Sequence, residues 1–189
     1  MGIHHIQTPL MPEVISGLSI GDEVLLSGTI YTARDQAHSR LCALLDGGEA
    51  LPMDLSGTII YFAGPTPTPP GKAVGSVGPT TSGRMDAFSP KLIRAGLKGM
   101  IGKGSRSQEV IEAMKSHGAI YFAATGGAGA LIAQRIKSST CIAYQELGPE
   151  AIYKMEVRDF PLVVAIDSKG ENLYIKGPEG HRVRSAKST

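Results

Sequence analysis

The chain has 189 residues, of which 42% are hydrophobic, and its formal net charge at pH 7 is only +2. A chain of this length can bury a sizeable core, so we expect one domain over residues 1–189 that folds without disulfides. The small basic excess and the 5% aromatic content argue against a general nucleic-acid-binding protein.

The cysteines and the N-terminal residues indicate a compartment. Cys42 and Cys141 form neither a CxxC pair nor a disulfide framework, so we expect no metal site in this chain and a reducing environment. Residues 1–12 lack the basic and apolar regions of a secretion signal. No segment offers the roughly 20 unbroken apolar residues that a membrane helix requires. We therefore expect a cytoplasmic protein that is not bound to membranes.

A strand followed by a helix is predicted near the N-terminus. Residues 22–31 are rich in Val, Leu, Ile and Thr, which favours a strand. The following helix is expected to have Asp35 as its N-cap and Gly47 as its left-handed stop. Arg34 then lies at a strand-to-helix junction, where unpaired N–H groups favour an anion. Pairing of Arg34 with a surface acid is an equally open interpretation.

The middle of the chain continues this alternation. Residues 58–63 predict a short buried strand, which leads into a stiff, proline-rich loop at 64–71. A short helix is expected from Ser89, with Pro90 at its first turn, and it closes near Gly96.

Another helix and strand follow. Ser105 and Gln108 have the spacing of a capping box for a helix that reaches His117. Residues 119–124 predict a buried strand, and a glycine-rich turn at 125–130 leads into a helix through about residue 136. This turn lacks the full dinucleotide-binding pattern, so close strand–helix packing explains its glycines more simply.

The C-terminal part reads as strands. We expect strands at 141–144, 153–157 and 162–166, the last forming an antiparallel hairpin with 172–175. A short basic tail at 181–189 is expected to be frayed. Strands interleaved with helices in the middle and a hairpin at the end predict a layered α/β domain with a mixed sheet.

Positive charge is concentrated in one region. Between residues 84 and 106 the chain carries six basic residues and a single acid, Asp86. Arginine offers a planar fork for carboxylate or phosphate and lysine adds a point charge, so together they can bind a small molecule with more than one acidic group. A solvated basic face is the alternative interpretation.

Several sequence blocks carry a family resemblance. The string GPTTSGRMD at 78–86, followed by MIGKG at 100–104, resembles the signature of the iron-sulfur class I fumarate hydratase and tartrate dehydratase family. The matching part of that family is its β subunit or C-terminal domain. Blocks at 28–35, 124–128 and 147–152 lie in the order and spacing of the same family, so the resemblance spans nearly the whole chain.

This resemblance implies an architecture and an assembly. The implied fold is a three-layer swivelling β/β/α domain. The implied partner is an α subunit that holds a 4Fe-4S cluster through three cysteines and leaves one iron open. The chain is then a β subunit that is inactive alone, in a hetero-oligomer such as a dimer of αβ units. Cys42 and Cys141 are expected to be buried structural thiols.

The resemblance also implies a reaction, the reversible hydration of fumarate to (S)-malate. Removing a proton beside a carboxylate builds an enolate-like dianion, which requires fixed positive groups. Arg34, Arg84 and Lys103 match the family's substrate-binding positions. Thr80 matches the threonine proposed as the base, but its hydroxyl is too weak a base at neutral pH unless cations stabilise its alkoxide or it relays a proton.

Other residues near these positions have simpler interpretations. Thr81 and Ser82 either fix the turn or bind a substrate carboxylate, and turn chemistry is favoured. His38 is expected to be a structural histidine, although it lies one helical turn beyond Arg34, and Met85 is expected to pack in the core.

Alternative functions remain open from the sequence. L-tartrate, dehydrated to oxaloacetate, and methyl-substituted fumarates are the other substrates considered, since the partner is expected to form the pocket walls that distinguish them. A different class of function is a non-catalytic module that binds a dicarboxylate.

Overall fold

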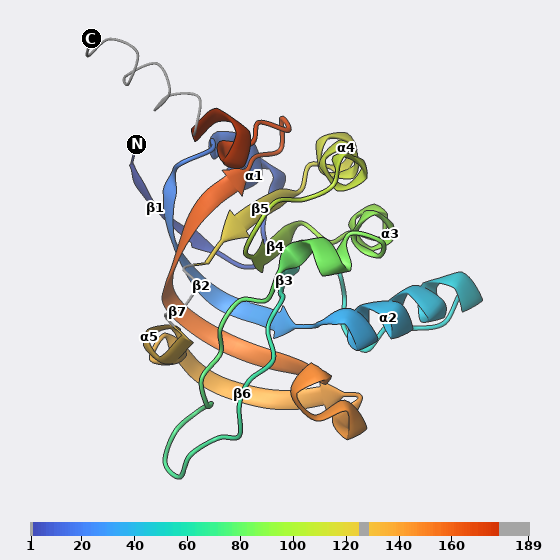
Figure 1. The fold of residues 1–189 in the computed structure, drawn as a ribbon, viewed down its shortest axis with the longest axis vertical. Coiled ribbons are helices and arrows are strands. Elements are labelled where there is room, and N and C mark those ends of the chain that lie inside the picture. The colour runs from blue at the N-terminus through green and yellow to red at the C-terminus, as the bar shows by residue number, and fades with distance from the viewer. Residues whose placement is uncertain (1, 125–128, 178–189) are drawn as a thin grey trace, which may run out of the picture.

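The computed structural model describes residues 2–124 and 129–177, which form a mixed sheet with helices (Figure 1). The seven-stranded sheet has the order β1-β2-β3-β4-β5-β7-β6. Its strands are β1 (Ile3–Gln7), β2 (Glu23–Thr32), β3 (Ile59–Tyr61), β4 (Gly99–Gly102), β5 (Ile120–Ala123), β6 (Ile136–Ala143) and β7 (Ile152–Ile166). Strands β1 to β5 pair in parallel, whereas β7 pairs antiparallel with each of its neighbours. The predicted α/β class with a mixed sheet is confirmed.

Strand β7 closes part of this sheet into a ring. It pairs with β2 along most of its length and with β5 near its end, so that Val163 lies opposite both Glu23 and Ala123. Strands β2, β3, β4, β5 and β7 therefore form a continuous circuit. Because the two sides of this circuit face each other, they supply two β layers.

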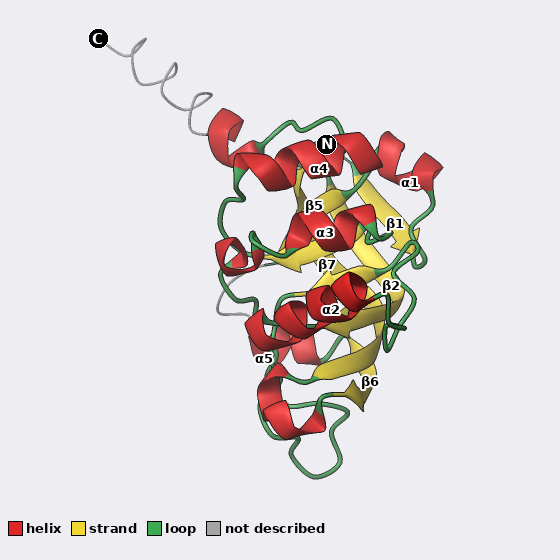
Figure 2. Ribbon diagram, turned by 90° about the vertical axis from the view of Figure 1, so that its right-hand side faces the viewer, coloured by secondary structure: helices red, strands yellow, loops and turns green. Residues whose placement is uncertain are grey.

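Three helices, α2 (Asp35–Gly47), α3 (Ser89–Arg94) and α4 (Gln108–His117), supply the third layer. Helices α1 (Pro12–Gly17) and α5 (Gly129–Ala133) instead pack against the core inside the ring, through Ile15 and Ile132. The 3-10 turns are η1 (Ser82–Met85) and η2 (Gln145–Glu150). Figure 2 shows α2, α3 and α4 side by side over one face of the sheet. This arrangement agrees with the β/β/α layering that the resemblance implied.

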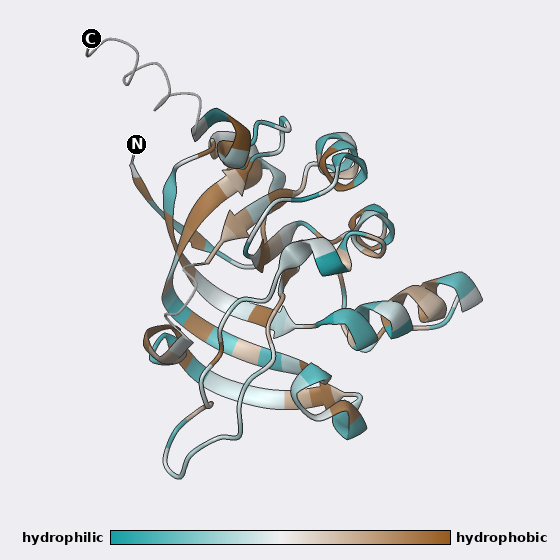
Figure 3. Ribbon diagram, in the orientation of Figure 1, coloured by the Kyte–Doolittle hydropathy of each residue, from teal (hydrophilic) through white to brown (hydrophobic). Residues whose placement is uncertain are grey.

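Two cores occupy the two faces of the central strands. On β3, Ile59 and Tyr61 join the core inside the ring, whereas Ile60 joins the core under the helices. On β5, Phe122 faces the ring interior and Tyr121 faces the helices. Successive side chains on a strand point to opposite faces, so strands buried on both sides are apolar throughout. Figure 3 accordingly shows these strands as largely hydrophobic.

The predicted caps of α2 are each wrong by one residue. Arg34 is the N-cap, and Asp35 is the first helical residue, with no side-chain cap. The Asp35 carboxylate pairs with Arg84 instead. The left-handed stop is Gly48, with φ of 66°, rather than Gly47.

The predicted capping box of α4 is also wrong. Ser107, not Ser105, is the N-cap, and its hydroxyl accepts a hydrogen bond from Val110 N at 3.4 Å. Ser107 N in turn donates to the Asp86 carboxylate at 2.6 Å. This contact with a distant loop fixes where the helix begins.

The C-terminal hairpin is wrong too. The expected strands at 153–157 and 162–166 are parts of β7, and residues 173–177 are helical. Only an isolated bridge joins Ile166 and Asn172. The Asn172 side chain accepts from Tyr174 N at 3.0 Å and so starts the helical turn.

The remaining differences concern β6 and segments outside the described residues. Strand β6 begins at Ile136, where a helix was expected to end, because α5 stops at Ala133. The glycine turn at 125–128 and the basic tail at 181–189 lie outside the described residues. Among the helices of the described ranges, none is long and apolar enough to cross a bilayer.

Candidate active site

Three of the predicted site residues lie at one edge of the sheet. Arg34 and Lys103 follow closely after β2 and β4, and Thr80 is bonded to Phe62, the residue after β3. These three strands run parallel, so their carboxyl ends meet at the same edge. In α/β sheets this edge is where ligands commonly bind.

The loop that carries Thr80 is bonded directly to the loop that carries Lys103. Lys103 N donates to Thr80 O at 3.3 Å, and Ser82 N donates to Lys103 O at 2.9 Å. Thr80 is itself anchored, because its N and Oγ1 both donate to Phe62 O, at 2.7 and 2.8 Å. The Lys103 side chain is exposed, and no acid of the described residues forms an ion pair with it.

The two predicted substrate-binding arginines are each paired with an acid. Arg84 forms an ion pair with Asp35, which brings its guanidinium to the start of α2 beside Arg34. Arg34 Nη2 lies 3.1 Å from Glu150 Oε1, so Arg34 is paired with an acid, and that acid is partly buried rather than on the surface. Arg34 Nε and Glu150 Oε2 are buried without a hydrogen-bond partner among the described residues. These two atoms are thus a donor and an acceptor that nothing in the described part of the chain pairs.

Gly64 allows the segment around Glu150 to approach Arg34. A Cβ atom at Gly64 would lie 2.5 Å from Pro149 O and 3.3 Å from Arg34 Cδ. A larger residue would separate η2 from the end of β2. The Arg34–Glu150 pair thus depends on a glycine in the proline-rich loop.

The basic run from residue 84 to 106 does not form a single patch. Arg106 is buried, with Nε 2.7 Å from Asp86 Oδ1 and Nη2 donating to Ser89 Oγ at 2.7 Å. Its guanidinium lies 5.1 Å from the centres of the Phe62 and Tyr121 rings. Burial lowers the pKa of Arg106, and the Asp86 carboxylate opposes that shift.

Other members of that run are also engaged elsewhere. Lys91 Nζ lies 2.6 Å from Asp46 Oδ1, and Lys98 donates to His117 O. Arg84 and Lys103 are the members of the run that reach the strand edge described above. The concentration of charge in the sequence therefore overstates the size of the anion site.

His38 supports the site from below. Its side chain is buried, and Nδ1 lies 2.9 Å from Arg34 O. Burial lowers the pKa of His38 to about 4, so the ring is neutral at physiological pH. It packs edge-on against Phe62 at 5.2 Å, which agrees with the structural role expected of it.

The remaining expectations concern packing and metal ligands. Met85 and Cys42 are buried, whereas Cys141 is only half-buried. The Cys42 thiol donates to Phe88 O at 3.8 Å. Within the described ranges no three His, Cys, Asp or Glu side chains are grouped to hold a metal ion. The described side chains, among which Cys42 and Cys141 are the cysteines, therefore do not provide the ligands that a 4Fe-4S cluster needs.

Sequence reasoning missed the acids at the site. The sequence pattern favours Asp35 as a helix cap, and Glu150 stands out only as part of the family block at 147–152. Both lie far in sequence from the arginines that they contact, so no local pattern reveals the pairing. The strongest available signal for Glu150 was its place in the block at 147–152.

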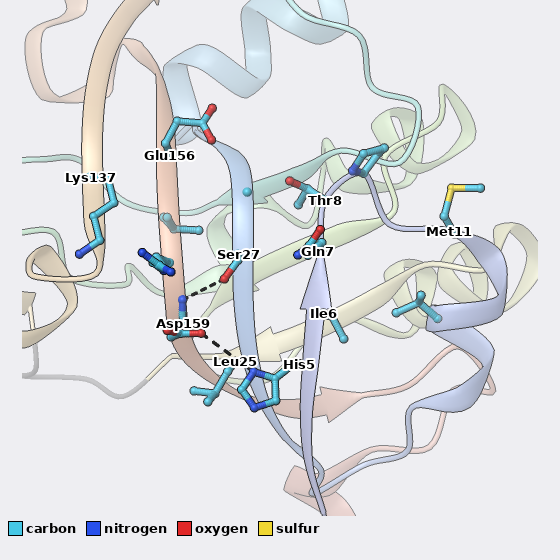
Figure 4. A pocket seen from close by; sticks show the side chains of 15 residues that line it. His5, Ile6, Gln7, Thr8, Met11, Leu25, Ser27, Lys137, Glu156 and Asp159 are labelled. Atoms are coloured by element: carbon cyan, nitrogen blue, oxygen red, sulfur yellow. Dashed lines mark hydrogen bonds and ion pairs between the residues drawn. The ribbon is translucent and has the colours of Figure 1, made fainter.

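A second concave region lies away from these residues. A groove with a volume of about 930 Å³ is lined by β1, β2, β6 and β7. Figure 4 shows His5, Glu156, Asp159 and Lys137 around it, with β2 passing between β1 and β7. His5 Nδ1 is 4.0 Å from Asp159 Oδ1. None of the predicted site residues lines this groove.

Comparison with known proteins identifies the family. The family model described as Fumarase C-terminus matches residues 3–177. The chain is 45% identical over 169 residues to "Fumarate hydratase class I, aerobic" of Escherichia coli (strain K12), covering 87% of this chain and 31% of that protein. It is 43% identical over 164 residues to "Fumarate hydratase 2" of Leishmania major, covering 86% and 29%. The chain thus spans about a third of these relatives.

A relative of similar length completes the comparison. The chain is 40% identical over 170 residues to the "Putative L(+)-tartrate dehydratase subunit beta" of Methanocaldococcus jannaschii, covering 85% of both proteins. The family model covers nearly all of the described residues, and the loop string at 78–86 falls within the match. The chain therefore belongs to the fumarase C-terminus family, whose relatives named here are hydratases and dehydratases.

Proposed function

We propose that the chain is the β subunit of a two-subunit iron-sulfur hydro-lyase that adds water reversibly to fumarate and forms (S)-malate. The observation that carries this proposal is the meeting of Arg34, Thr80 and Lys103 at one strand edge, with Arg84 drawn to the same place by Asp35. The match to a relative named as a β subunit, over 85% of both chains, supports the two-chain arrangement.

The cations of this chain bind the two carboxylates of the substrate. Arg84 and Lys103 are exposed at the edge, and Arg34 keeps a buried Nε without a partner. When a proton leaves the carbon beside a carboxylate, negative charge grows on that carboxylate. Fixed guanidinium and ammonium groups stabilise this charge more strongly than they stabilise the substrate, which lowers the barrier.

Asp35 and Glu150 orient the two arginines in this proposal. Each acid contacts one arginine, and these contacts hold the guanidinium planes in place before a substrate arrives. Preorganised donors need no rearrangement during the reaction. The remaining N–H groups of each arginine are then available to a substrate carboxylate.

Thr80 accepts the proton in the dehydration direction. Its hydroxyl donates to Phe62 O in the structure, so it must first lose its own proton to solvent and become an alkoxide, or pass that proton on as the substrate proton arrives. The positive charge of Lys103, on the neighbouring bonded loop, favours the alkoxide form.

The cofactor belongs to the partner in this proposal. A 4Fe-4S cluster on the α subunit, with one open iron, supplies a Lewis acid for a substrate carboxylate and hydroxyl. The described side chains of this chain provide binding, orientation and proton transfer. The complete pocket then forms only when both subunits meet, so the β subunit alone is inactive.

L-tartrate dehydration to oxaloacetate is the second candidate reaction. The relative that matches this chain over 85% of both lengths carries a tartrate dehydratase name, which favours that reaction. Tartrate differs from malate by one hydroxyl, and the same cations suit both diacids.

The test is reconstitution with the partner. The chain is co-expressed anaerobically with a cysteine-bearing α subunit encoded beside it, iron is restored, and rates with fumarate, malate and L-tartrate are compared. Activity with fumarate or malate supports the first reaction, and activity only with L-tartrate supports the second. If the α subunit alone is as active as the complex, the proposal is contradicted.

A binding experiment with the isolated chain tests the non-catalytic alternative. Calorimetric titration with malate is expected to show no tight binding, because the pocket is incomplete. Micromolar affinity without a partner, combined with an inactive complex, would identify a dicarboxylate-binding module instead.

A further inference from the structure

The hydroxyl of Tyr121 lies between the two loops that carry the candidate site. Tyr121 Oη donates to Gly104 O at 2.9 Å and lies 2.8 Å from Ser82 Oγ. Because its hydrogen is given to Gly104 O, Ser82 is the donor in the second hydrogen bond. Burial raises the pKa of Tyr121 above its usual value, so the phenol keeps its hydrogen at neutral pH.

These contacts reach the immediate neighbours of the proposed site residues. Ser82 begins η1, the turn that carries Arg84, and Gly104 follows Lys103 in the chain. The backbone bonds from Ser82 N to Lys103 O and from Lys103 N to Thr80 O also join these two loops. One buried hydroxyl is therefore bonded to both segments.

The surroundings of Tyr121 hold both loops close to its hydroxyl. A Cβ atom at Gly102 would collide with Ser82 Oγ and lie 3.0 Å from the Phe62 ring, so only glycine leaves room for Ser82 here. The buried Arg106 guanidinium lies over the Tyr121 ring at 5.1 Å and is fixed by Asp86, which is in the same loop as Arg84. The phenol thus stands in a rigid, fully packed setting.

We propose that Tyr121 is a positioning residue of the site, whose hydroxyl sets the separation between Lys103 and the Thr80–Arg84 loop. This inference rests on the proposed function, and it assigns Tyr121 no contact with substrate. A displacement of a charged group by about 1 Å can lower a rate by about 100-fold. Loss of the hydrogen-bonded bridge between the two loops can therefore lower the rate without removing any group that contacts substrate.

The test compares two tyrosine variants in the complete complex with the α subunit. Tyr121→Phe removes the bridging hydroxyl. Tyr61→Phe is the matched control, because Tyr61 is equally buried and donates one hydrogen bond, to Val77 O at 3.0 Å, which lies just before the Thr80 loop and does not join that loop to the Lys103 loop. Each variant loses one buried hydroxyl, and Tyr121→Phe should lower Tm somewhat more, because its hydroxyl makes two hydrogen bonds and that of Tyr61 makes one.

Activity separates positioning from mere stability. Tyr121→Phe should reduce kcat by about tenfold or more, whereas Tyr61→Phe should remain within about twofold of wild type. Ser82→Ala should reproduce most of the Tyr121→Phe loss. The double variant of Ser82 and Tyr121 should be little worse than Tyr121→Phe alone, because both changes remove the same bridge.

Two results would overturn the inference. One is a Tyr121→Phe complex as active as the Tyr61→Phe complex, and the other is full additivity of the Ser82 and Tyr121 losses. If the wild-type complex is active and the Arg84→Ala complex is not, these results reject the positioning role of Tyr121 and leave the proposed function standing. An inactive wild-type complex rejects the proposed function and this inference together. If Tyr121→Phe does not fold, the kcat of Ser82→Ala decides in the same way.

Discussion

The strand edge that holds Arg34 and the groove of Figure 4 share strand β2, and both combine three basic side chains with two acids. They differ in how these groups are held. In the groove, His5 and Asp159 approach only to 4.0 Å, and the charged side chains project from strands. At the edge, loops are bonded to one another above a buried network. Charge content alone therefore does not identify a site, whereas a rigid support beneath the charges does.

The largest effect is expected from Arg84→Ala. Loss of this exposed guanidinium should lower kcat/KM of the complex by about 1,000-fold, because it removes charge that stabilises the transition state. The fold should be retained, since 54% of the Arg84 side chain is exposed. Arg94→Ala, an exposed arginine of the same basic run, is the control and should be nearly neutral. Initial rates within threefold of wild type for Arg84→Ala would refute its role.

Lys103→Ala should lower kcat/KM by about 100-fold. Because no described acid pairs with Lys103, its removal should leave Tm almost unchanged. Lys103→Arg keeps the charge and should recover part of the activity. Equal rates for the alanine and wild-type complexes would exclude this lysine from the site.

Thr80→Val should lower kcat by about 100-fold with a small change in KM, as expected for loss of a proton acceptor. Thr80→Ser keeps the hydroxyl and should retain most activity. The check is steady-state kinetics of both variants. If the valine variant keeps most of its activity, another group receives the proton.

The buried imidazole of His38 predicts a pH dependence of stability. An unfolded histidine binds a proton below pH 6.5, whereas folded His38 stays neutral until about pH 4. The unfolded state thus binds more protons in this interval, so the free energy of unfolding falls as pH decreases from 6.5 to 4. The full contribution is about 3 kcal/mol. Urea unfolding of His38→Asn should show a weaker decrease over that interval, and an unchanged decrease would contradict this account.

The smallest effect is expected in the groove. Lys137→Ala removes a positive charge from the groove, yet kcat and KM of the complex should stay within about twofold of wild type. A tenfold loss of kcat/KM would show that the groove takes part in function and that a rigid support beneath the charges is not what distinguishes a site.

Local patterns predicted much of the fold. The strands near 22–31, 58–63 and 119–124 were found because runs of apolar and β-branched residues are bounded by glycines and turns. Strands β1 and β4 were not predicted. Strand β4 has only four residues, two of them glycine, so its pairing with β3 and β5 decides its structure.

The continuity of β7 was also beyond local reasoning. Two separate strands are expected at 153–157 and 162–166, but Pro161, which lies between them, pairs with Leu25 in the ladder. Asp159 adopts φ of 50°, and a register shift between Leu26 and Gly28 accommodates the irregularity. The partners on both sides hold the strand together.

The candidate site was predictable in its cations and not in their partners. The loop string and the glycines around Lys103 are enough, as residue types in order, to indicate an anion site. Nothing local distinguished buried Arg106 from exposed Arg84, because burial depends on where Asp86 and Ser89 meet it. Of the six basic residues in this run, the fold thus places two at the strand edge and buries one, Arg106, beneath them.

The closure of the ring by β7 has a consequence for how the chain is made. Thr29 of β2 and Glu156 of β7, which are bonded side by side where β7 closes the ring, are 127 positions apart, so the ribosome must release the chain beyond Glu156 before they can meet. Long-range pairing of this kind slows folding. Nascent chains that end before residue 152 would display unpaired strand edges, and they are the species that chaperones are expected to protect.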